Sequence, residues 1–165
     1  MKLFALAFAL VLSGTASLFA QASGVALGGF GYDSDLPVEI TADSLDVNQA
    51  DGAATFSGNV LIGQGDMRLS AGKVVVEYGE TDDGRTEISR LVASGGVTLV
   101  SADEAAEAET AIYAVGLGVV TLRGDVLLTQ GATSISGDTL EVNLDTGRGT
   151  ISGNVRTILN AGGGN

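Results

Sequence analysis

Carboxylates are the only abundant side chains in this sequence that could carry out chemistry. The 165 residues include 20 Asp and Glu against 8 Lys and Arg, with no His and no Cys. The chain therefore has no thiol or imidazole for nucleophilic catalysis or for a zinc site. A pair of acids could hydrolyse a glycosidic bond, but so many acids on a small domain produce chance pairs. The residues predict a protein that is not an enzyme and has no cofactor, with a carboxylate enzyme as an alternative.

Two other kinds of binding site find little support in the residues. Asp103, Glu104, Glu107 and Glu109 offer oxygen ligands for Ca²⁺ but lack the glycine-bearing spacing of calcium loops, so we predict no metal site. The glycines around Gly63-Gln64-Gly65 lie between short strands, without the following helix that a phosphate loop needs. The excess of acids disfavours nucleic acid as a partner, because its phosphates would be repelled.

Residues 1–22 have the pattern of a secretory signal peptide. Lys2 precedes the apolar run Leu3–Leu12, and Ala20-Gln21-Ala22 forms an A-x-A site, so we predict cleavage after Ala22. The apolar run is too short for a membrane span, and no second run of about 18 apolar residues follows. Cleavage removes Lys2 and leaves seven basic against 20 acidic residues, a formal charge of −13.

A repeated segment organises the rest of the chain. Ile40–Val60 returns as Ile135–Val155 without a gap and with 11 of 21 positions identical. Two weaker copies lie between them and end, like the strong ones, in a Gly-x-Val closure whose valine is Val97 or Val126. The first step between closures is longer because it contains a polar loop at Gly79–Thr86. A period near 30 residues indicates stacked repeats.

Each repeat has the pattern of a β-hairpin with one apolar face. Leu45 and Val47 alternate with polar neighbours, and a turn-forming run precedes a second alternating stretch around Phe56. One hairpin cannot shield such a face from water, so about four of them must stack into an all-β domain. We expect a flexible lead-in at 23–36, one domain at 37–159 and a flexible tail at 160–165. The strands are predicted near 38–48, 53–63, 66–78, 86–93, 96–101, 106–114, 117–123, 125–130, 133–144 and 149–159.

Several short motifs resemble a known family in their order and spacing. They are Asp33–Ile40, Ser44-Leu45-Asp46, Thr55–Val60, Gln64-Gly65 and Lys73–Val76 in the first half, and Val119–Asp125 and Ile135–Asp138 in the second. Together they are similar to the periplasmic lipopolysaccharide-transport LptA (OstA-like) family over nearly the whole mature chain.

The resemblance implies a single twisted, V-shaped antiparallel β-jelly roll with an open apolar groove, located in the periplasm. It implies a carrier that binds the lipid A acyl chains of lipopolysaccharide and passes the lipid from the inner to the outer membrane. The implied partners are lipopolysaccharide, an inner-membrane anchor, an outer-membrane translocon with related modules, and further copies joined head to tail through terminal strands. The alternating pattern assigns these inward-facing groove residues: Val38, Ile40, Leu45, Val47, Phe56, Val60, Ile62, Leu69, Val74, Val76, Val120, Leu122, Leu140 and Val142. The residues alone leave a second function open, a filament-forming β-solenoid with a packed interior and no ligand.

Overall fold

The computed structural model describes residues 23–26, 36–48 and 52–159, and these form almost nothing but antiparallel strands. A single 3₁₀ turn, η1 (Val115–Leu117), interrupts them within the described residues. The strands are β1 (Ser23–Ala26), β2 (Glu39–Thr41), β3 (Ser44–Asn48), β4 (Ala53–Gln64), β5 (Met67–Glu80), β6 (Thr86–Ser101), β7 (Glu104–Ala114), β8 (Val119–Gln130), β9 (Thr133–Asn143), β10 (Arg148–Ser152) and β11 (Arg156–Leu159). The all-β prediction is confirmed. The predicted signal peptide and tail lie outside the described residues, as do 27–35 of the lead-in.

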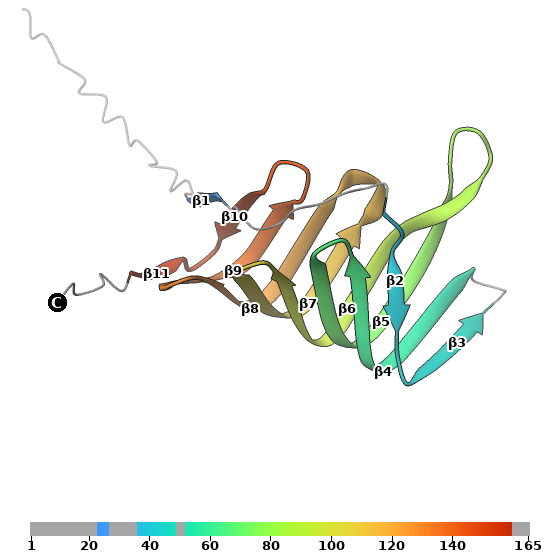
Figure 1. Ribbon diagram of the computed structural model, residues 1–165, viewed down its shortest axis with the longest axis horizontal. Coiled ribbons are helices and arrows are strands. Elements are labelled where there is room, and N and C mark those ends of the chain that lie inside the picture. Colours follow the sequence, from blue (N-terminus) through green and yellow to red (C-terminus); the bar gives the residue numbers. More distant parts are fainter. Residues whose placement is uncertain (1–22, 27–35, 49–51, 160–165) are drawn as a thin grey trace, which may run out of the picture.

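All eleven strands belong to one unclosed sheet. Its order is β1-β10-β9-β8-β7-β6-β5-β4-β2, with β3 also paired to β4 and β11 also paired to β9. Consecutive long strands are therefore neighbours, as expected for stacked hairpins. Figure 1 shows the stack with β2 and β3 at one end and β1, β10 and β11 at the other.

A line of corners folds this sheet into two arms. At each Gly-x-Val closure two successive residues have positive φ, as in Gly58 (79°) and Asn59 (44°), and the register shifts between the flanking pairs. Glycine reaches this conformation without a Cβ clash, so the strand can bulge and turn. The other corners lie at Gly95-Gly96, Gly124-Asp125 and Gly153-Asn154. The predicted V-shaped jelly roll is consistent with this folded, unclosed sheet.

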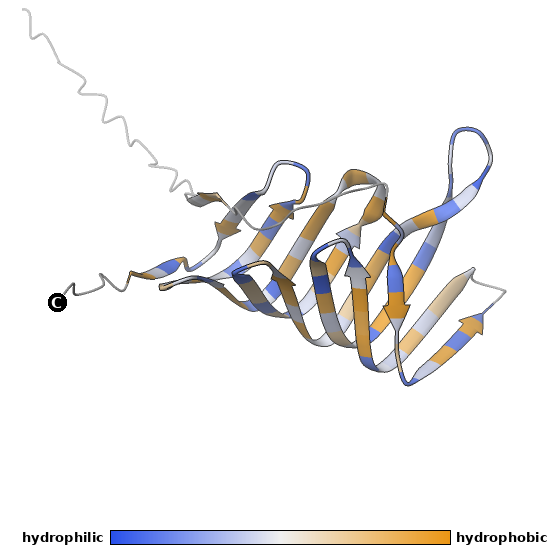
Figure 2. Ribbon diagram, in the orientation of Figure 1, coloured by the Kyte–Doolittle hydropathy of each residue, from blue (hydrophilic) through white to orange (hydrophobic). Residues whose placement is uncertain are grey.

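We call the two halves the first arm and the second arm. The first arm contains β1, β3, β10 and residues 53–57, 73–80, 86–94, 110–114, 119–123 and 139–143 of the long strands. The second arm contains β2, β11 and the remaining halves of β4 to β9. Buried apolar side chains from both arms form one continuous cluster between them. In Figure 2 the alternation along each strand is visible as successive hydrophobic and hydrophilic bands.

Several predicted strand boundaries were wrong at the corners. The predicted pairs 86–93 with 96–101 and 117–123 with 125–130 are the single strands β6 and β8. Hydrogen bonds to neighbours on both sides carry these inner strands through the bulge. The predicted strands 38–48 and 149–159 break at the corner instead, into β2 and β3 and into β10 and β11. Among the described residues β2, β3 and β11 each pair with one strand, so fewer hydrogen bonds hold the chain in one strand through these two corners.

Part of the predicted flexible lead-in is also ordered. Ser23–Ala26 form β1, which pairs with β10 in antiparallel fashion. Four residues carry no periodic signal of their own, so only the exposed edge of β10 explains this strand.

The polar loop that lengthens the first repeat is a projecting hairpin. β5 and β6 extend past their neighbours and turn at Thr81–Arg85, where Thr81 N donates to Arg85 O over 2.8 Å. Figure 1 shows this hairpin standing out from the sheet. Within the described residues no helix has the length and apolar character needed to cross a membrane.

Candidate functional site

An apolar surface runs through the interior from one end of the stack to the other. On the first arm, directly paired residues form two inward rows that cross β4 to β10. One row is Phe56, Val74, Ala93, Ala111, Leu122, Leu140 and Ile151, and the other is Ala54, Val76, Leu91, Tyr113, Val120, Val142 and Gly149. Period-two alternation explains why each strand contributes one residue to each row.

The second arm supplies the facing wall. Its main inward row is Ile40, Ile62, Leu69, Leu99, Ala106, Leu128, Ile135 and Thr157. Val60, Val97 and Val126, the closing valines of the inner corners, are buried beside this row. A valine after each corner thus helps to fill the angle between the arms.

Most residues assigned to the groove from sequence lie on these inward rows. Those that are buried are Val60, Ile62, Leu69, Val74, Val76, Val120, Leu122, Leu140 and Val142. Val38, Ile40 and Phe56 are half-buried and pack against the same cluster. Their contact with lipid stays a prediction. The sequence assignment missed Leu91, Leu99, Tyr113, Leu128 and Ile135, although the same alternation around Leu99 and Leu128 could have identified those two.

Leu45 and Val47 differ from the other assigned residues. They pair with Phe56 and Ala54 and so share the inward face, yet 55% and 62% of their surface is exposed. β3 is a terminal strand, and within the described residues it pairs with β4 alone. The apolar interior therefore continues to the β3 edge of the sheet and meets solvent there.

Elsewhere the interior is filled by its own side chains. Ile62, Leu99 and Leu128 on the second arm have no exposed surface, and neither do Val74 and Leu122 on the first. The arms are also joined by a buried hydrogen bond, in which Tyr113 Oη donates to Gln64 Oε1 over 2.7 Å. In this conformation the two arms are closed on each other and hold no empty slot between those residues.

Polar side chains gather where the second arm ends. Gln64 Nε2 donates to Leu36 O over 2.9 Å, and Gln130 Nε2 donates to Ala26 O over 3.0 Å and also to Glu104 Oε1. Glu104 is buried on this inner side. Glu107, three residues along the alternating strand, lies exposed on the outer face. The acids considered for calcium are thus divided between two faces, and the described residues contain no group of three acids arranged to hold a metal ion.

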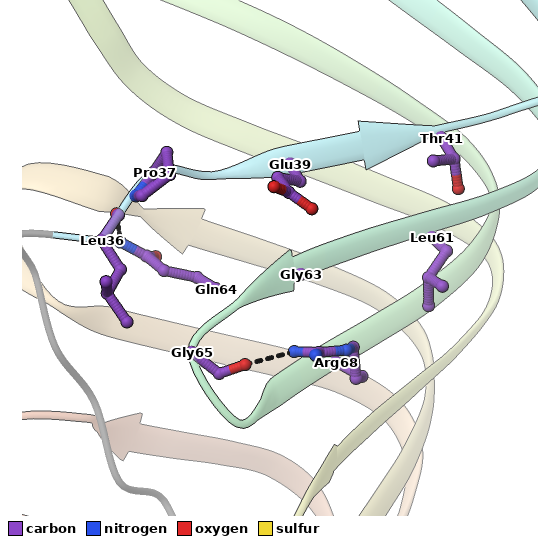
Figure 3. Close-up of a pocket in the computed structure, with 9 residues that line it drawn as sticks. All are labelled: Leu36, Pro37, Glu39, Thr41, Leu61, Gly63, Gln64, Gly65 and Arg68. Carbon is purple, nitrogen blue, oxygen red and sulfur yellow. Dashed lines mark hydrogen bonds between the residues drawn. The ribbon is translucent and has the colours of Figure 1, made fainter.

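A surface depression of about 340 Å³ lies on the outer face of the second arm at its β2 end. Figure 3 shows its lining, in which Arg68 donates a hydrogen bond to the Gly65 carbonyl oxygen and Gln64 reaches Leu36. Arg68 Nη1 also donates to Met67 O over 2.7 Å. Both hydrogen bonds of the guanidinium satisfy the adjacent turn, so we assign this depression a structural role.

Among the described residues, a carboxyl with a shifted pKa lies far from the interior. The pKa of Asp83, at the tip of the projecting hairpin, is lowered because the Thr81 hydroxyl and then the Arg85 guanidinium donate to it. Asp83 and Arg85 form an exposed ion pair of 2.7 Å. This arrangement orders a turn and offers no acid-base pair for catalysis.

Comparison with known proteins agrees with this architecture. The crystal structure of LptH, described as the LptA homologous periplasmic component of the lipopolysaccharide transport device of Pseudomonas aeruginosa, superposes with a TM-score of 0.63. It is 16% identical, and the match covers 78% of this chain and 98% of LptH. That similarity concerns the fold.

Two sequence comparisons extend the agreement. The uncharacterized protein R00383 of Rhizobium meliloti (strain 1021) is 30% identical over 160 residues, which cover 90% of this chain and 86% of the relative. The family described as LptA/(LptD N-terminal domain) LPS transport protein matches residues 39–148, from the first edge strand to the start of β10. The chain therefore belongs to the LptA/LptD N-terminal domain family of lipopolysaccharide transport proteins.

Proposed function

We propose that this protein is a periplasmic carrier that binds the lipid A acyl chains of lipopolysaccharide along its apolar interior. It would pass the lipid from an inner-membrane anchor towards an outer-membrane translocon, both built with related modules. The observation that carries the proposal is the apolar interior that spans the whole stack and reaches solvent at Leu45 and Val47. Family membership supports the lipid class. Export by a signal peptide cleaved after Ala22 is part of the same proposal.

The energetics explain why such an interior is useful. Exposing one methylene to water costs about 0.8 kcal/mol, so one chain of about 12 carbons costs on the order of 10 kcal/mol. A continuous apolar surface lowers this cost along the whole path. The task needs no catalytic residue, and the energy for directed movement must be supplied elsewhere.

Binding acyl chains would require the arms to separate. The buried residues leave no slot, and the Tyr113–Gln64 hydrogen bond holds the arms together. A ligand with higher affinity for an open conformation shifts the population towards it. The exposed β3 end is the natural place for entry, because its apolar residues already contact water.

Head-to-tail assembly would extend this path across the periplasm. Within the described residues β2 and β3 pair only with β4, and β11 pairs only with β9. Unpaired strand edges can accept a strand of another chain through main-chain hydrogen bonds. Contact between two different ends does not close on itself, so it yields a growing stack.

Site-specific photocrosslinking in cells tests lipid binding. A photoreactive residue at Leu45 or Val47 should crosslink to lipopolysaccharide. The matched control is Asp46, which lies in the same exposed strand but on the opposite face. Equal crosslinking from Asp46 and Val47, or none from either inward position, would contradict the proposal.

The filled interior favours a second candidate function, a filament-forming scaffold without a ligand. Lipid extraction and mass spectrometry of the purified protein distinguish the two. Co-purifying acylated lipid supports the carrier, whereas assembled protein free of lipid supports the scaffold.

A further inference from the structure

The first strand of the described chain occupies an edge that belongs to the far end of the stack. β1 pairs with β10 in the register Ser23 to Ile151, Gly24 to Thr150, Val25 to Gly149 and Ala26 to Arg148. Gln130 Nε2 adds a hydrogen bond to Ala26 O. Val25 is half-buried against the core, and Ile151 in β10 is fully buried. Leu45, in the terminal strand at the opposite end, is more than half exposed. The β10 edge is therefore covered by the chain itself, whereas no described strand covers the β3 edge (Figure 1).

The repeats indicate how a second copy would fit onto the β10 edge. Where two neighbouring strands pass the corner, one strand uses two residues (Gly-x) and the other uses one residue. The residue before the Gly-x pair is then paired with the residue that follows the one-residue corner. The pairs are Ser57 with Lys73, Ser94 with Thr110 and Arg123 with Thr139. Apart from β1, the stack of described strands has the Asp43 corner of β2 and β3 at one end and the Gly153-Asn154 corner of β10 and β11 at the other. Its two ends are thus the two halves of one more junction.

The same rule fixes the register of that junction. Ser152 would pair with Ser44 of the second copy, and Val155 with Ala42 of the second copy. When this pairing is extended along both arms, inward residues lie opposite inward residues. Ile151, for example, faces Leu45 of the second copy. Charges also match, because residues 148–159 contain two arginines and no acid, whereas residues 38–48 contain three acids and no base.

In this register β3 of the second copy coincides with β1. Val47 of the second copy would face Gly149, where Val25 now lies, and Asp46 of the second copy would face Thr150, where Gly24 lies. We propose that β1 is an internal placeholder for a second copy's β3, and that it must leave the β10 edge before head-to-tail assembly at that edge. This inference rests on the head-to-tail contact of the proposed function and names how that contact is regulated.

The exchange favours the incoming strand. β1 has four residues and packs Val25 against the core. β3 has five residues and brings Leu45 and Val47, both more than half exposed in the free chain. The adjacent β11 is exposed along its whole length and offers a first contact for β2 of the incoming copy. A placeholder raises the apparent Kd for a second copy, because the intrinsic Kd is divided by the fraction of molecules in which the edge is uncovered.

Weakening β1 should therefore strengthen assembly. The full mature chain with Val25→Asp places a carboxylate against the apolar core, and we expect half-assembly at about a tenfold lower protein concentration. Gly24→Asp is the matched control, because it adds the same charge in open space on the outer face. We expect its midpoint to stay within about twofold of the unsubstituted protein. Equal midpoints for Val25→Asp and Gly24→Asp would overturn the placeholder.

Locking β1 in place should have the opposite effect. The chain has no cysteine, so Gly24→Cys with Thr150→Cys introduces one disulfide between directly paired, exposed positions. Oxidised protein should remain monomeric at concentrations where the reduced protein assembles in light scattering. If unsubstituted protein assembles and the oxidised lock assembles equally well, the placeholder is wrong and the carrier proposal is untouched. If neither assembles under any condition, both the placeholder and the head-to-tail contact are wrong. Lipid loading of the locked monomer, measured by mass spectrometry, tests the carrier function separately.

Discussion

At the scale of single residues, a buried hydrogen bond between two side chains helps to link the arms, and a row of glycines shapes the corner. Tyr113 and Gln64 lie 49 positions apart and meet in a buried contact of 2.7 Å. Nothing in the local sequence of either residue signals this pairing, because each sits in an ordinary alternating strand. The corners are different, since the repeated Gly-x-Val closures already indicated tight turns. Their physical basis is the pair of positive-φ residues in each closure.

Tyr113→Phe should destabilise the fold by about 1–3 kcal/mol, because Gln64 Oε1 would lose a buried donor. Urea denaturation measures the loss. Tyr78→Phe is the control, since Tyr78 is exposed and removal of its hydroxyl should change stability little. Identical midpoints for the two variants would show that the cross-arm bond contributes nothing.

Two glycines separate backbone strain from steric clash at the corner. Gly58 and Gly96 have φ of 79° and 80°, but a Cβ at Gly58 would lie 2.5 Å from Asp43 Oδ2, whereas one at Gly96 meets nothing within 4 Å. Gly96→Ala should cost about 1 kcal/mol from the left-handed conformation alone. Gly58→Ala should cost about 2–3 kcal/mol, because it also displaces Asp43 from its 2.8 Å hydrogen bond with Asn59. Thermal or urea unfolding that ranks Gly96→Ala as the more damaging change would refute this assignment.

At the scale of strands, the alternation pattern determined most of the fold. Period-two spacing places Val60 and Ile62 of β4 on one face whatever the neighbours are, and both are buried. The pattern could not distinguish a bulge within one strand from a turn between two strands. Gly95-Gly96 has the sequence of a turn, and only the pairing of β6 with β5 and β7 on both sides of these glycines makes it a bulge. The pattern could not find β1 either, since that strand exists only through the edge of β10. The pattern also could not predict which inward residues at the ends of the sheet are exposed. Leu45 is exposed because its strand is terminal, and alternation does not show that.

β2 provides a test of the edge strand's role. Ile40 is half-buried opposite Ile62, in a strand of three residues with one partner. Such a short edge can release locally, so Ile40→Asp should cost less stability than Phe56→Ala, for which we expect about 2–3 kcal/mol. The same change places a carboxylate in the apolar path and should abolish lipid loading. Thr41→Asp, on the exposed outer face of β2, is the control and should load normally. Normal loading of Ile40→Asp would exclude β2 from the lipid path.

At the scale of the whole molecule, the two ends of the stack differ in charge as well as in shape. The mature chain carries a formal charge of −13 after the predicted cleavage, so copies repel one another at a distance. The β10 and β11 end nevertheless presents Arg148 and Arg156, and the β2 and β3 end presents Glu39, Asp43 and Asp46, all exposed. Long-range repulsion and short-range attraction therefore act on the same contact.

Added salt should favour assembly, because the two effects differ in range. The screening length falls from about 30 Å at 0.01 M salt to about 8 Å at 0.15 M, which removes the repulsion between distant acids. Exposed pairs in contact are each worth at most about 1 kcal/mol, so their weakening does not reverse the trend. We expect oligomer size in light scattering to rise with protein concentration and with salt over this range. A monomer at all concentrations and salt levels would contradict the head-to-tail contact.

The contact charges can be separated from the net charge by two substitutions with the same charge change. Arg156→Glu places a carboxylate at the exposed end strand, where the expected register brings Thr41 of the second copy opposite it and Glu39 of the second copy nearby. Arg123→Glu makes the same change on β8, in the exposed outer face away from both ends. Both variants gain equal long-range repulsion, so any difference between their concentrations for half-assembly comes from contacts at the junction.

Arg156→Glu should raise the concentration for half-assembly about fivefold to tenfold above that of Arg123→Glu, as expected for one attractive contact replaced by a repulsive one. The gap should narrow at 0.5 M salt, where screening is stronger. Equal midpoints at low salt would mean that the copies do not meet through β11 in this register.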